Sequence, residues 1–396
     1  MNNKFRTRQS FIKKKIIFID TGSIIGGGQN NLILIVNNLN LQKFTPVVFS
    51  RSNSSLLSIL TEAKIKTKEL SLISKTSSSI GNIIIMIMNM FYLTYQLLKL
   101  VYYEKPEIID SHCNDSHLPA IIVAKFFNIS VVVHQNIYIK QIRHRIIDYL
   151  CGIFSDRIIS ISKATQKKLT LPSSAINKLN VVYPSIHPNI FNSDLSNRFS
   201  LRNSYKIKDD QIVIGTLARI SPEKGLEYLI KAIQKIKDAH FNIKLIIAGD
   251  VSSEAEKQYE QKLFDIINEQ KMENDVIFHR KTLNNVIEGS YDFNDFDISV
   301  APSIDEAFGM FILESMALKI AVVASNVGGI PEVVVPDETA ILVNPRDSNA
   351  LAKAILILII DKKKRIKMGE NGRKRAAKYF SINRTMLKIE RIFNEI

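Results

Sequence analysis

The strongest constraint on the fold of this 396-residue chain is an alternation of short β-branched runs with helical segments, which occurs twice. In the first half, strand-like runs such as Lys15–Ile19 and Ser130–His134 alternate with helical stretches such as Asn30–Leu41. Continuous apolar strands between helices are typical of a parallel sheet, because helices cover both of its faces. The first half is therefore predicted to form a doubly wound α/β domain.

The alternation stops and then restarts, which predicts a second domain of the same class. Tyr183–Ser204 contains two prolines and several Asn and Ser residues, a composition typical of a linker. Strand-like runs return at Gln211–Leu217 and continue to Ala340–Val343. A chain of this length also suits two cores better than one. We expect two tandem Rossmann-like α/β domains that face each other across a cleft, at 1–187 and 188–380.

Positive charge is concentrated in the first half. Up to Ser185 the sequence has 23 lysines and arginines against 9 aspartates and glutamates, whereas from Ile186 onward it has 30 against 29. A basic surface attracts polyanions, such as nucleic acid or the anionic face of a membrane. A solvated surface that keeps the protein soluble is the simpler interpretation. The sequence has no helix-turn-helix, zinc-finger or RNP-type signature, so nucleic acid is not expected as a partner.

The cysteines and the N-terminus favour a cytoplasmic protein. Cys113 and Cys151 are too few and too isolated for a disulfide framework or a zinc site, so a reducing compartment is expected. Met1–Lys15 is basic and polar, and the apolar run that follows is too short for a signal peptide.

The segment Ile83–Tyr103 is apolar enough to span a bilayer. Polar residues interrupt it, however, and it lies between two expected strands of one sheet, so a spanning helix would split the domain. A buried core helix and a helix that contacts a membrane surface are the favoured interpretations, and a transmembrane helix is the third.

A strand-to-helix loop in the second half carries two cations. Gln211–Leu217 is followed by Arg219 and Lys224, and a helix is expected to begin near Pro222–Gly225. Backbone N–H groups at a helix start favour anions. Each charge-assisted hydrogen bond from an arginine or lysine contributes on the order of 1.5–3 kcal/mol of stabilising free energy. The loop is suited to a pyrophosphate, and two surface cations near a turn are the alternative.

A second loop, after another apolar strand, contains Glu306 and Glu314, eight positions apart. A carboxylate can accept two hydrogen bonds from vicinal hydroxyls, which suits a sugar or a ribose. Glu314 lies among apolar residues, where a carboxylate without a partner would be costly. Between the two, Gly309 permits close backbone approach, and the N–H groups of Met310 and Phe311 lie at a helix start.

These residues resemble the motifs of the retaining glycosyltransferases of family 4. Glu306 and Glu314 look like the Glu-x7-Glu motif, and Arg219 with Lys224 looks like the phosphate-binding Arg-x4-Lys motif. The other landmarks that match in order and spacing are Gly26-Gly27-Gly28, His134, Ser155-Asp156-Arg157, Ser160–Lys163 and Val327–Glu332. The match extends from Ile16 to about Phe380.

The resemblance implies the GT-B arrangement and sugar transfer with retention, with no metal and no other cofactor. It also implies a C-terminal helix at 381–396 that crosses back to the first domain. It implies that Arg219 and Lys224 neutralise the diphosphate of a nucleotide-sugar donor as it leaves. Glu314 would hold the ribose, and Glu306 would hold the transferred sugar. Cleavage of the donor bond passes through an oxocarbenium-like state, and fixed cations can stabilise the leaving group. No protein nucleophile is evident.

Further residues receive roles from the same resemblance. Gly309, Met310 and Phe311 would bind the donor through their backbone, Gly27 and Gly28 would line the cleft from the acceptor side and count among the donor-binding residues, and His134 would act as a catalytic residue that contacts the sugar or the attacking hydroxyl. For His112, a structural role is favoured over a place in the cleft. Glu332 either contacts the nucleotide-sugar or only starts a helix.

The sequence departs from the family pattern at three loops. They contain Pro184-Ser185-Ile186, His279-Arg280-Lys281 and Asp250. The last two lie near the nucleotide in the family, which leaves the base open.

The expected function is retaining transfer of a sugar, with a UDP-sugar as the first choice of donor. The acceptor would be a saccharide or a lipid-linked saccharide, in surface polysaccharide or glycolipid synthesis. The protein is expected in the cytoplasm. Because the basic first domain suits an anionic membrane surface, peripheral contact at the inner face of the cell membrane is a further option. An epimerase-like enzyme acting on a nucleotide-sugar and a non-catalytic carbohydrate- or membrane-binding protein are the alternatives.

Overall fold

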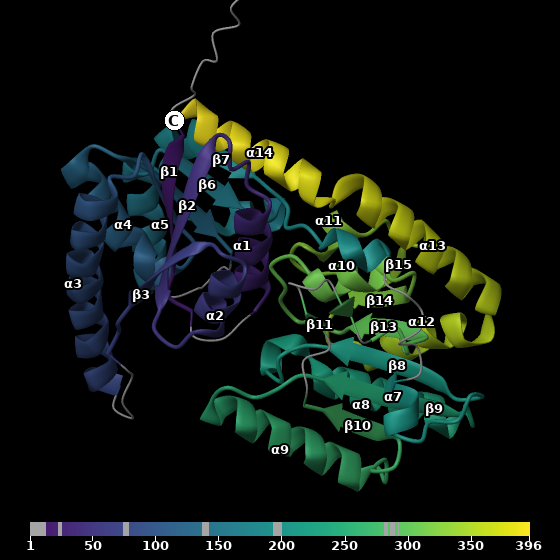
Figure 1. Ribbon diagram of the computed structural model, residues 1–396. Coiled ribbons are helices and arrows are strands. Elements are labelled where there is room, and N and C mark those ends of the chain that lie inside the picture. Colours follow the sequence, from purple (N-terminus) through teal and green to yellow (C-terminus); the bar gives the residue numbers. More distant parts are fainter. Residues whose placement is uncertain are drawn as a thin grey trace, which may run out of the picture. The chain divides into compact units, whose positions relative to one another are not determined.

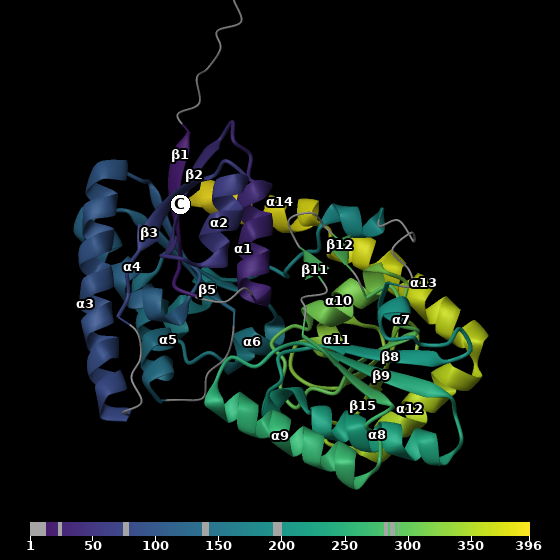
Figure 2. The same cartoon turned by 60° about the horizontal axis from the view of Figure 1, so that its bottom comes forward.

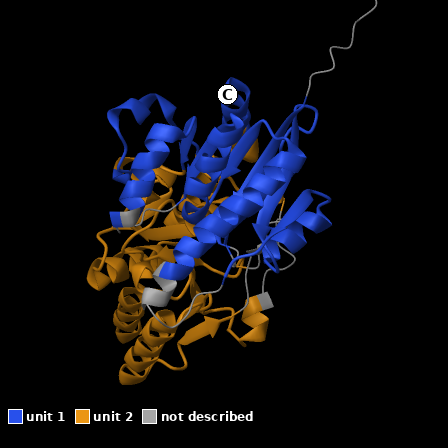
Figure 3. Ribbon diagram, turned by 90° about the vertical axis from the view of Figure 1, so that its left-hand side faces the viewer, with its two compact units in different colours: residues 1–160, 168–182, 386–396 blue, residues 161–167, 183–385 orange. Residues whose placement is uncertain are grey.

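The protein is described by a computed structural model, and the chain divides into two compact units (Figure 3). Unit 1 contains residues 1–160, 168–182 and 386–396, and unit 2 contains residues 161–167 and 183–385. The residues whose structure is described are 13–22, 26–73, 79–136, 142–192, 200–280, 284–285, 290–291 and 293–396.

Unit 1 contains a parallel seven-stranded sheet in the order β3-β2-β1-β4-β5-β6-β7. Its strands are β1 (Lys14–Asp20), β2 (Phe44–Arg51), β3 (Lys66–Leu70), β4 (Ile108–Ser111), β5 (Ser130–Gln135), β6 (Arg157–Ser160) and β7 (Leu179–Val181). All of its strand pairs are parallel. The strands in the centre of the sheet are buried along most of their length, as expected of a sheet covered on both faces.

Helices cover both faces of this sheet. They are α1 (Gly27–Asn37), α2 (Ser55–Glu62), α3 (Ser79–Glu104), α4 (Asn114–Phe127), α5 (Ile142–Phe154) and the short η1 (Ser173–Lys178). In Figure 1, α3, α4 and α5 lie on one side of the sheet, and α1 and α2 lie on the other. The C-terminal part of α14 (Ile382–Glu395) also belongs to unit 1.

Unit 2 contains a parallel six-stranded sheet in the order β10-β9-β8-β13-β14-β15. Its strands are β8 (Ile212–Leu217), β9 (Ile243–Ala248), β10 (Val276–His279), β13 (Ile298–Ala301), β14 (Ala321–Ser325) and β15 (Ala340–Val343). A separate two-stranded antiparallel pair consists of β11 (Asn284–Asn285) and β12 (Ser290–Tyr291).

Alternate residues of the unit 2 strands enter two different cores. In β9, Leu245 and Ile247 pack on one face of the sheet, and Ile246 and Ala248 pack on the other. The helices of this unit are α6 (Lys163–Lys168), of which residues 163–167 belong here, η2 (Pro188–Phe191), α7 (Ser200–Ser204), η4 (Pro222–Lys224), α8 (Leu226–Asp238), α9 (Glu254–Glu269), α10 (Met310–Ala317), α11 (Ile330–Val333), α12 (Ser348–Ile360) and α13 (Lys362–Tyr379). The first core receives α8, α9 and α12, and the second receives α10 and the end of α13.

The unit boundaries differ from the expected ones in two ways. Residues 161–167, expected in the first domain, group with unit 2, and the main boundary lies between Val182 and Tyr183. The reason for the first difference is local, because Ser162 Oγ donates a hydrogen bond to the carbonyl of Ala307, at 2.7 Å. The helix expected at 381–396 is α14, and its residues from Met386 onward belong to unit 1.

Candidate functional site

The candidate residues of unit 2 lie at the switch point of its sheet. The strand order reverses between β8 and β13, which are neighbours in the sheet although four strands of the chain separate them. Arg219 and Lys224 follow β8, and Glu306 follows β13. Loops that leave the carboxyl ends of two such strands diverge and form the usual ligand site of an open α/β sheet. The topology thus brings the two motifs to one edge.

Lys224 and Glu306 form an ion pair. The Nζ atom of Lys224 lies 2.8 Å from Oε2 of Glu306, and Ser303 Oγ lies 3.3 Å from the same oxygen. The side chains of the pair are 22% and 19% exposed, so they are held in place but can be reached from solvent. The arrangement offers a cation and a carboxylate side by side.

Close backbone packing holds the two loops together. Gly225 has a φ of 64°, and a Cβ there would lie 2.3 Å from the carbonyl oxygen of Pro302. The N–H of Ile304 donates to the carbonyl of Glu223 at 2.8 Å. These contacts fix the distance between the loop that carries Lys224 and the loop that carries Glu306. A side chain at position 225 would push the loops apart.

Arg219 is held by two carboxylates that the sequence analysis did not name. Its guanidinium lies 2.5 Å from Glu223 and 3.2 Å from Glu256, and its side chain is 56% exposed. Burial alone would raise the pKa of Glu223, but hydrogen bonds from the backbone and Ser221, together with Arg219, lower it, so the carboxylate stays ionised. Arg219 is therefore oriented by two carboxylates while much of its side chain stays exposed. Among the described residues, the ion pair of Glu306 is with Lys224 and not with Arg219.

The segment from Gly309 to Glu314 starts α10. Gly309 has a φ of 103° and precedes the first helical residue, Met310, so the strained position falls where a glycine is needed. Met310 and Phe311 are half-buried, and Glu314 is buried at 2% exposure. Met310 and Phe311 thus occupy the first helical turn, as expected, whereas Glu314 lies among the core residues of the helix.

Gly328 and Gly329 pack closely against the backbone of the loop that carries Glu306. A Cβ on Gly328, whose φ is 52°, would lie 1.8 Å from the carbonyl oxygen of Glu306, and one on Gly329 would lie 2.3 Å from that of Ala307. The N–H of Gly329 also donates to the carbonyl of Glu306 at 3.0 Å. The glycine pair is therefore required by the close approach of two backbones, which gives the Val327–Glu332 motif a physical reason.

Glu332 has a structural role in this structure. Its carboxylate accepts hydrogen bonds from the N–H groups of Lys163 and Ala164, at 2.8 and 2.7 Å, and from the hydroxyl of Tyr183 at 3.0 Å. Burial and the neighbouring carboxylate raise the pKa of Tyr183 to about 12, so this hydroxyl remains a donor. Glu332 caps the start of α6 and ties it to the segment that follows β7. Glu332 also lies in the first turn of α11, as expected of a residue that starts a helix, but its contact with the start of α6 was not expected from the sequence.

The candidate glycine loop of unit 1 lies at the switch point of its own sheet, between β1 and β4, whereas His134 lies in β5. Gly27 and Gly28 begin α1, and a Cβ on Gly28 would touch the amide of Asn136 at 3.6 Å. That amide donates to the carbonyl of His112 at 2.9 Å. Gln29 donates to Asp20, at the end of β1, at 3.1 Å. The glycine loop is thereby joined to the ends of the neighbouring strands.

His134 belongs to a buried cluster with Asp110 and His112. Its Nε2 lies 2.9 and 3.1 Å from the two oxygens of Asp110, and Nε2 of His112 lies 3.5 Å from the same carboxylate. The two imidazole rings stack, with centroids 3.9 Å apart and an interplanar angle of 19°. All three side chains are almost fully buried, and Nδ1 of His134 has no hydrogen-bond partner among the described residues.

Electrostatics keep the carboxylate of this cluster charged. Burial alone would raise the pKa of Asp110, but His134 and His112 lower it well below its usual range. Burial lowers the pKa of His134, against the effect of Asp110, and lowers that of nearby His117 to about 3. A neutral imidazole that donates through Nε2 keeps a lone pair on Nδ1.

The same three side chains offer atoms within 4.8 Å of one another, which is a spacing that could suit a metal. The nearly parallel stacking counts against it, because an imidazole binds a metal in the plane of its ring, and two parallel planes do not converge on one ion. The cluster is better described as a carboxylate shared by two histidines.

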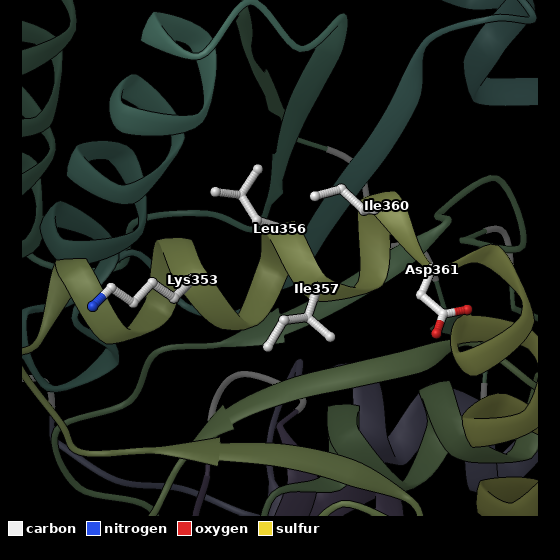
Figure 4. Close-up of a pocket in the computed structure, with 5 residues that line it drawn as sticks. All are labelled: Lys353, Leu356, Ile357, Ile360 and Asp361. Atoms are coloured by element: carbon white, nitrogen blue, oxygen red, sulfur yellow. The ribbon is translucent and has the colours of Figure 1, made fainter.

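A hollow beside α12 belongs neither to the candidate residues of unit 1 nor to those of unit 2. Its volume is about 510 Å³, and it is lined by Lys353, Leu356, Ile357, Ile360 and Asp361 (Figure 4). All five come from one helix and its C-cap, so no second element contributes a converging polar group. The hollow therefore lacks the features of a binding site.

The residues that hold the candidate side chains in place were not predicted from the sequence. Glu256 lies in α9 and Asp110 in β4, far from Arg219 and His134 in the chain. The only sequence signal for Asp110 was its place at the end of a strand, directly before Ser111 and His112.

Comparisons with known proteins agree with this architecture. Residues 197–375 match the family "Glycosyl transferases group 1". The structure of HepE from Anabaena in complex with UDP and glucose superposes with a TM-score of 0.82 at 21% identity, over 97% of this chain and 100% of that one. The predicted fold class, α/β with two tandem Rossmann-like domains of the GT-B type, is confirmed.

Sequence relatives are glycosyltransferases that the chain matches in part. The uncharacterized glycosyltransferase MJ1607 of Methanocaldococcus jannaschii is 31% identical over 52% of this chain and 51% of its own length. The capsular polysaccharide biosynthesis glycosyltransferase CapM of Staphylococcus aureus is 29% identical over 60% of this chain and 61% of its own length. The chain thus spans 51% of the length of MJ1607 and 61% of the length of CapM.

Proposed function

We propose that this protein is a retaining glycosyltransferase that moves a sugar from a UDP-sugar to a saccharide or lipid-linked saccharide. The observation that carries the proposal is the Lys224–Glu306 ion pair, 2.8 Å long and partly exposed, at the switch point of a group 1 glycosyltransferase domain. Support for the donor comes from HepE, whose structures contain UDP. Support for the acceptor class comes from CapM, named for capsular polysaccharide, and from a lipopolysaccharide 1,2-N-acetylglucosaminetransferase of Salmonella typhimurium.

Lys224 and Arg219 stabilise the leaving diphosphate in this proposal. Fixed cations act on the charge that develops as the donor bond breaks, and they need no reorganisation during the reaction. Arg219 is oriented in advance by Glu223 and Glu256. Lys224 exchanges part of its contact with Glu306 for the diphosphate when the donor binds. Glu306, released from this neutralisation, accepts hydrogen bonds from the hydroxyls of the transferred sugar.

The remaining residues position the donor and the acceptor. Glu314 holds the ribose, and Gly309, Met310 and Phe311 contribute backbone contacts. Gly27 and Gly28 line the acceptor side. His134 meets a sugar hydroxyl or the attacking hydroxyl through Nδ1, and Asp110 fixes its ring through Nε2. The reaction as proposed uses neither a metal nor another cofactor, and the protein acts in the cytoplasm at the inner face of the cell membrane.

The test is nucleotide release by purified protein from UDP-, GDP- and ADP-sugars, with and without a membrane lipid extract. Release of UDP alone, only with the extract, and its loss in Glu306→Ala support the proposal. Release without any sugar-containing product would indicate hydrolysis, and a changed sugar still attached to its nucleotide would indicate an epimerase. A product whose anomeric configuration is opposite to that of the donor would refute retention.

A further inference from the structure

We infer that the outward face of α3, α4 and α5 in unit 1 docks onto an anionic lipid surface. The inference rests on the membrane contact in the proposed function, and it assigns that contact to particular exposed and charged residues.

The first observation is an apolar stripe along the outer side of α3. Ile84, Met88, Phe91, Tyr95 and Tyr102 are spaced by three, four or seven positions, so they lie on one side of the helix. Phe91 is 66% exposed, Tyr95 51% and Tyr102 65%. A surface helix in a soluble domain would normally present polar residues on this side.

The opposite side attaches α3 to the domain. Leu93, Leu97 and Val101 are buried in the core of unit 1. The side chains of Asn89 and Gln96 exchange hydrogen bonds with the backbone of Ile73 and Ser71, at 2.8 to 3.0 Å. Residues 84–104 are long and apolar enough to cross a membrane, and 22% of the most apolar stretch of this segment is buried. Because one side belongs to the core of a parallel sheet, the helix is suited to lie on a bilayer rather than to cross it.

Exposed apolar side chains also occur on the two neighbouring helices. On α5, Ile142, Ile146, Tyr149 and Ile153 form a row at helical spacing, with exposures from 40% to 75%. On α4, Phe126 is 76% exposed. Figures 1 and 2 show α3, α4 and α5 side by side on one face of the sheet, and α4 packs against both of the others. Three adjacent helices thus carry exposed apolar side chains, and we call this set of side chains the apolar layer.

Charge decides which occupant fits this layer. Lys99, Lys125 and Arg145 are exposed on the three helices, whereas Glu104 and Asp148 are buried. The exposed carboxylate in the described part of these helices is Asp115, roughly 10 Å along α4 from the start of its exposed apolar residues. Aromatic and aliphatic side chains flanked by lysine and arginine suit the headgroup region of an anionic bilayer. A second copy of the chain would bring two positively charged faces together, which disfavours a symmetric dimer through this face.

The experiment is co-sedimentation of the full chain with vesicles, without donor or acceptor, so its outcome does not depend on sugar transfer. One set of vesicles contains equal parts of phosphatidylglycerol and phosphatidylethanolamine, and the other contains phosphatidylcholine alone. We expect binding to the anionic vesicles, weakened at high salt because charges are screened. Removal of two apolar anchors in Phe91→Ser/Tyr95→Ser should weaken binding at least tenfold. Removal of charge in Lys99→Gln/Lys125→Gln should weaken it about fivefold per lysine.

A matched control is Ile360→Ser. Ile360 is 70% exposed at the end of α12 in unit 2, and this change should leave vesicle binding intact. Circular dichroism of each variant checks that the fold is kept, which is expected because the replaced side chains are exposed. Equal binding to both vesicle types, or binding that survives both double substitutions, would overturn the inference. A dimer in sedimentation velocity that Phe91→Ser/Tyr95→Ser dissolves, without vesicle binding, would assign the face to a second copy instead.

Discussion

At the scale of single residues, the candidate site depends on contacts between backbones as much as on charged groups. Gly328 is the sharpest example, because its φ of 52° and the carbonyl of Glu306 leave no room for a side chain. The sequence motif around it is thus a packing requirement that positions a candidate ligand-binding loop.

We expect Gly328→Ala to lower the free energy of unfolding by about 2–4 kcal/mol, through a left-handed backbone and a steric clash. It should also lower transfer activity, because the loop that carries Glu306 must move. The control is Gly372→Ala in α13, where the added methyl meets the flexible side chain of Met316 at 3.1 Å. Urea unfolding of both variants checks this, and equal stability of the two would contradict the account.

The buried histidines give a pH dependence whose sign follows from their pKa values. The pKa of His117 is lowered to about 3, so this residue is neutral in the folded protein and takes up a proton on unfolding at any pH between about 6.5 and 3. Stability from this group is complete above pH 6.5 and falls as the pH decreases, by up to about 1.4 kcal/mol per pH unit.

NMR titration of the imidazole protons should show one histidine that stays neutral to about pH 3. His117→Asn should reduce the loss of stability between pH 7 and pH 5, measured by urea unfolding. If the pH dependence is the same in both proteins, the assignment to His117 is wrong.

At the scale of elements, strands were easier to predict than the side chains that hold the candidate site residues in place. Ala340–Val343 was predicted with its observed bounds, because a buried parallel strand is a continuous apolar run. β3 was missed, since Lys66–Leu70 is an edge strand with mostly exposed polar residues and has no apolar pattern. α3 was recognised as apolar, but its division into a buried side and an exposed side depends on tertiary packing that a hydropathy pattern does not contain.

Glu332 shows why residue roles at this scale need the structure. Its partners, the N–H groups that begin α6, are more than 160 positions earlier in the chain. We expect Glu332→Gln to lower the free energy of unfolding by about 1–3 kcal/mol, because an amide cannot accept all three hydrogen bonds. UDP affinity, measured by calorimetry, should not change. A large loss of affinity with unchanged stability would return Glu332 to the donor site.

At the scale of the whole molecule, the C-terminal residues complete the first unit. Phe393 is fully buried and meets Phe18 and Phe44 with ring centroids 6.1 and 5.9 Å apart. Lys14 Nζ also donates to the carbonyls of Phe393 and Ile396, at 3.0 and 2.6 Å. The sequence predicted a helix here and its return to the first domain, but not the aromatic contacts.

Phe393→Ala should destabilise the protein by about 3–5 kcal/mol, since a buried aromatic side chain is lost. Leu387→Ala, on the same helix at 72% exposure, is the control and should change stability by less than about 0.5 kcal/mol. Hydrogen exchange of β1 amides measures the effect in unit 1. Equal exchange in the two variants would contradict the proposed role of this helix.

The two motifs of unit 2 were predicted from spacing, but their meeting as an ion pair was not, because it depends on β8 and β13 being neighbours in the sheet. Calorimetric titration of UDP into the wild type, Lys224→Met and Lys231→Met therefore tests the central claim. Lys231 is exposed on α8 in the same unit, so its loss removes an equal charge away from the site. The account predicts affinity about 10 to 150 times weaker for Lys224→Met and nearly unchanged for Lys231→Met. Equal affinities of all three proteins for UDP would contradict the assignment of the switch point as the donor site.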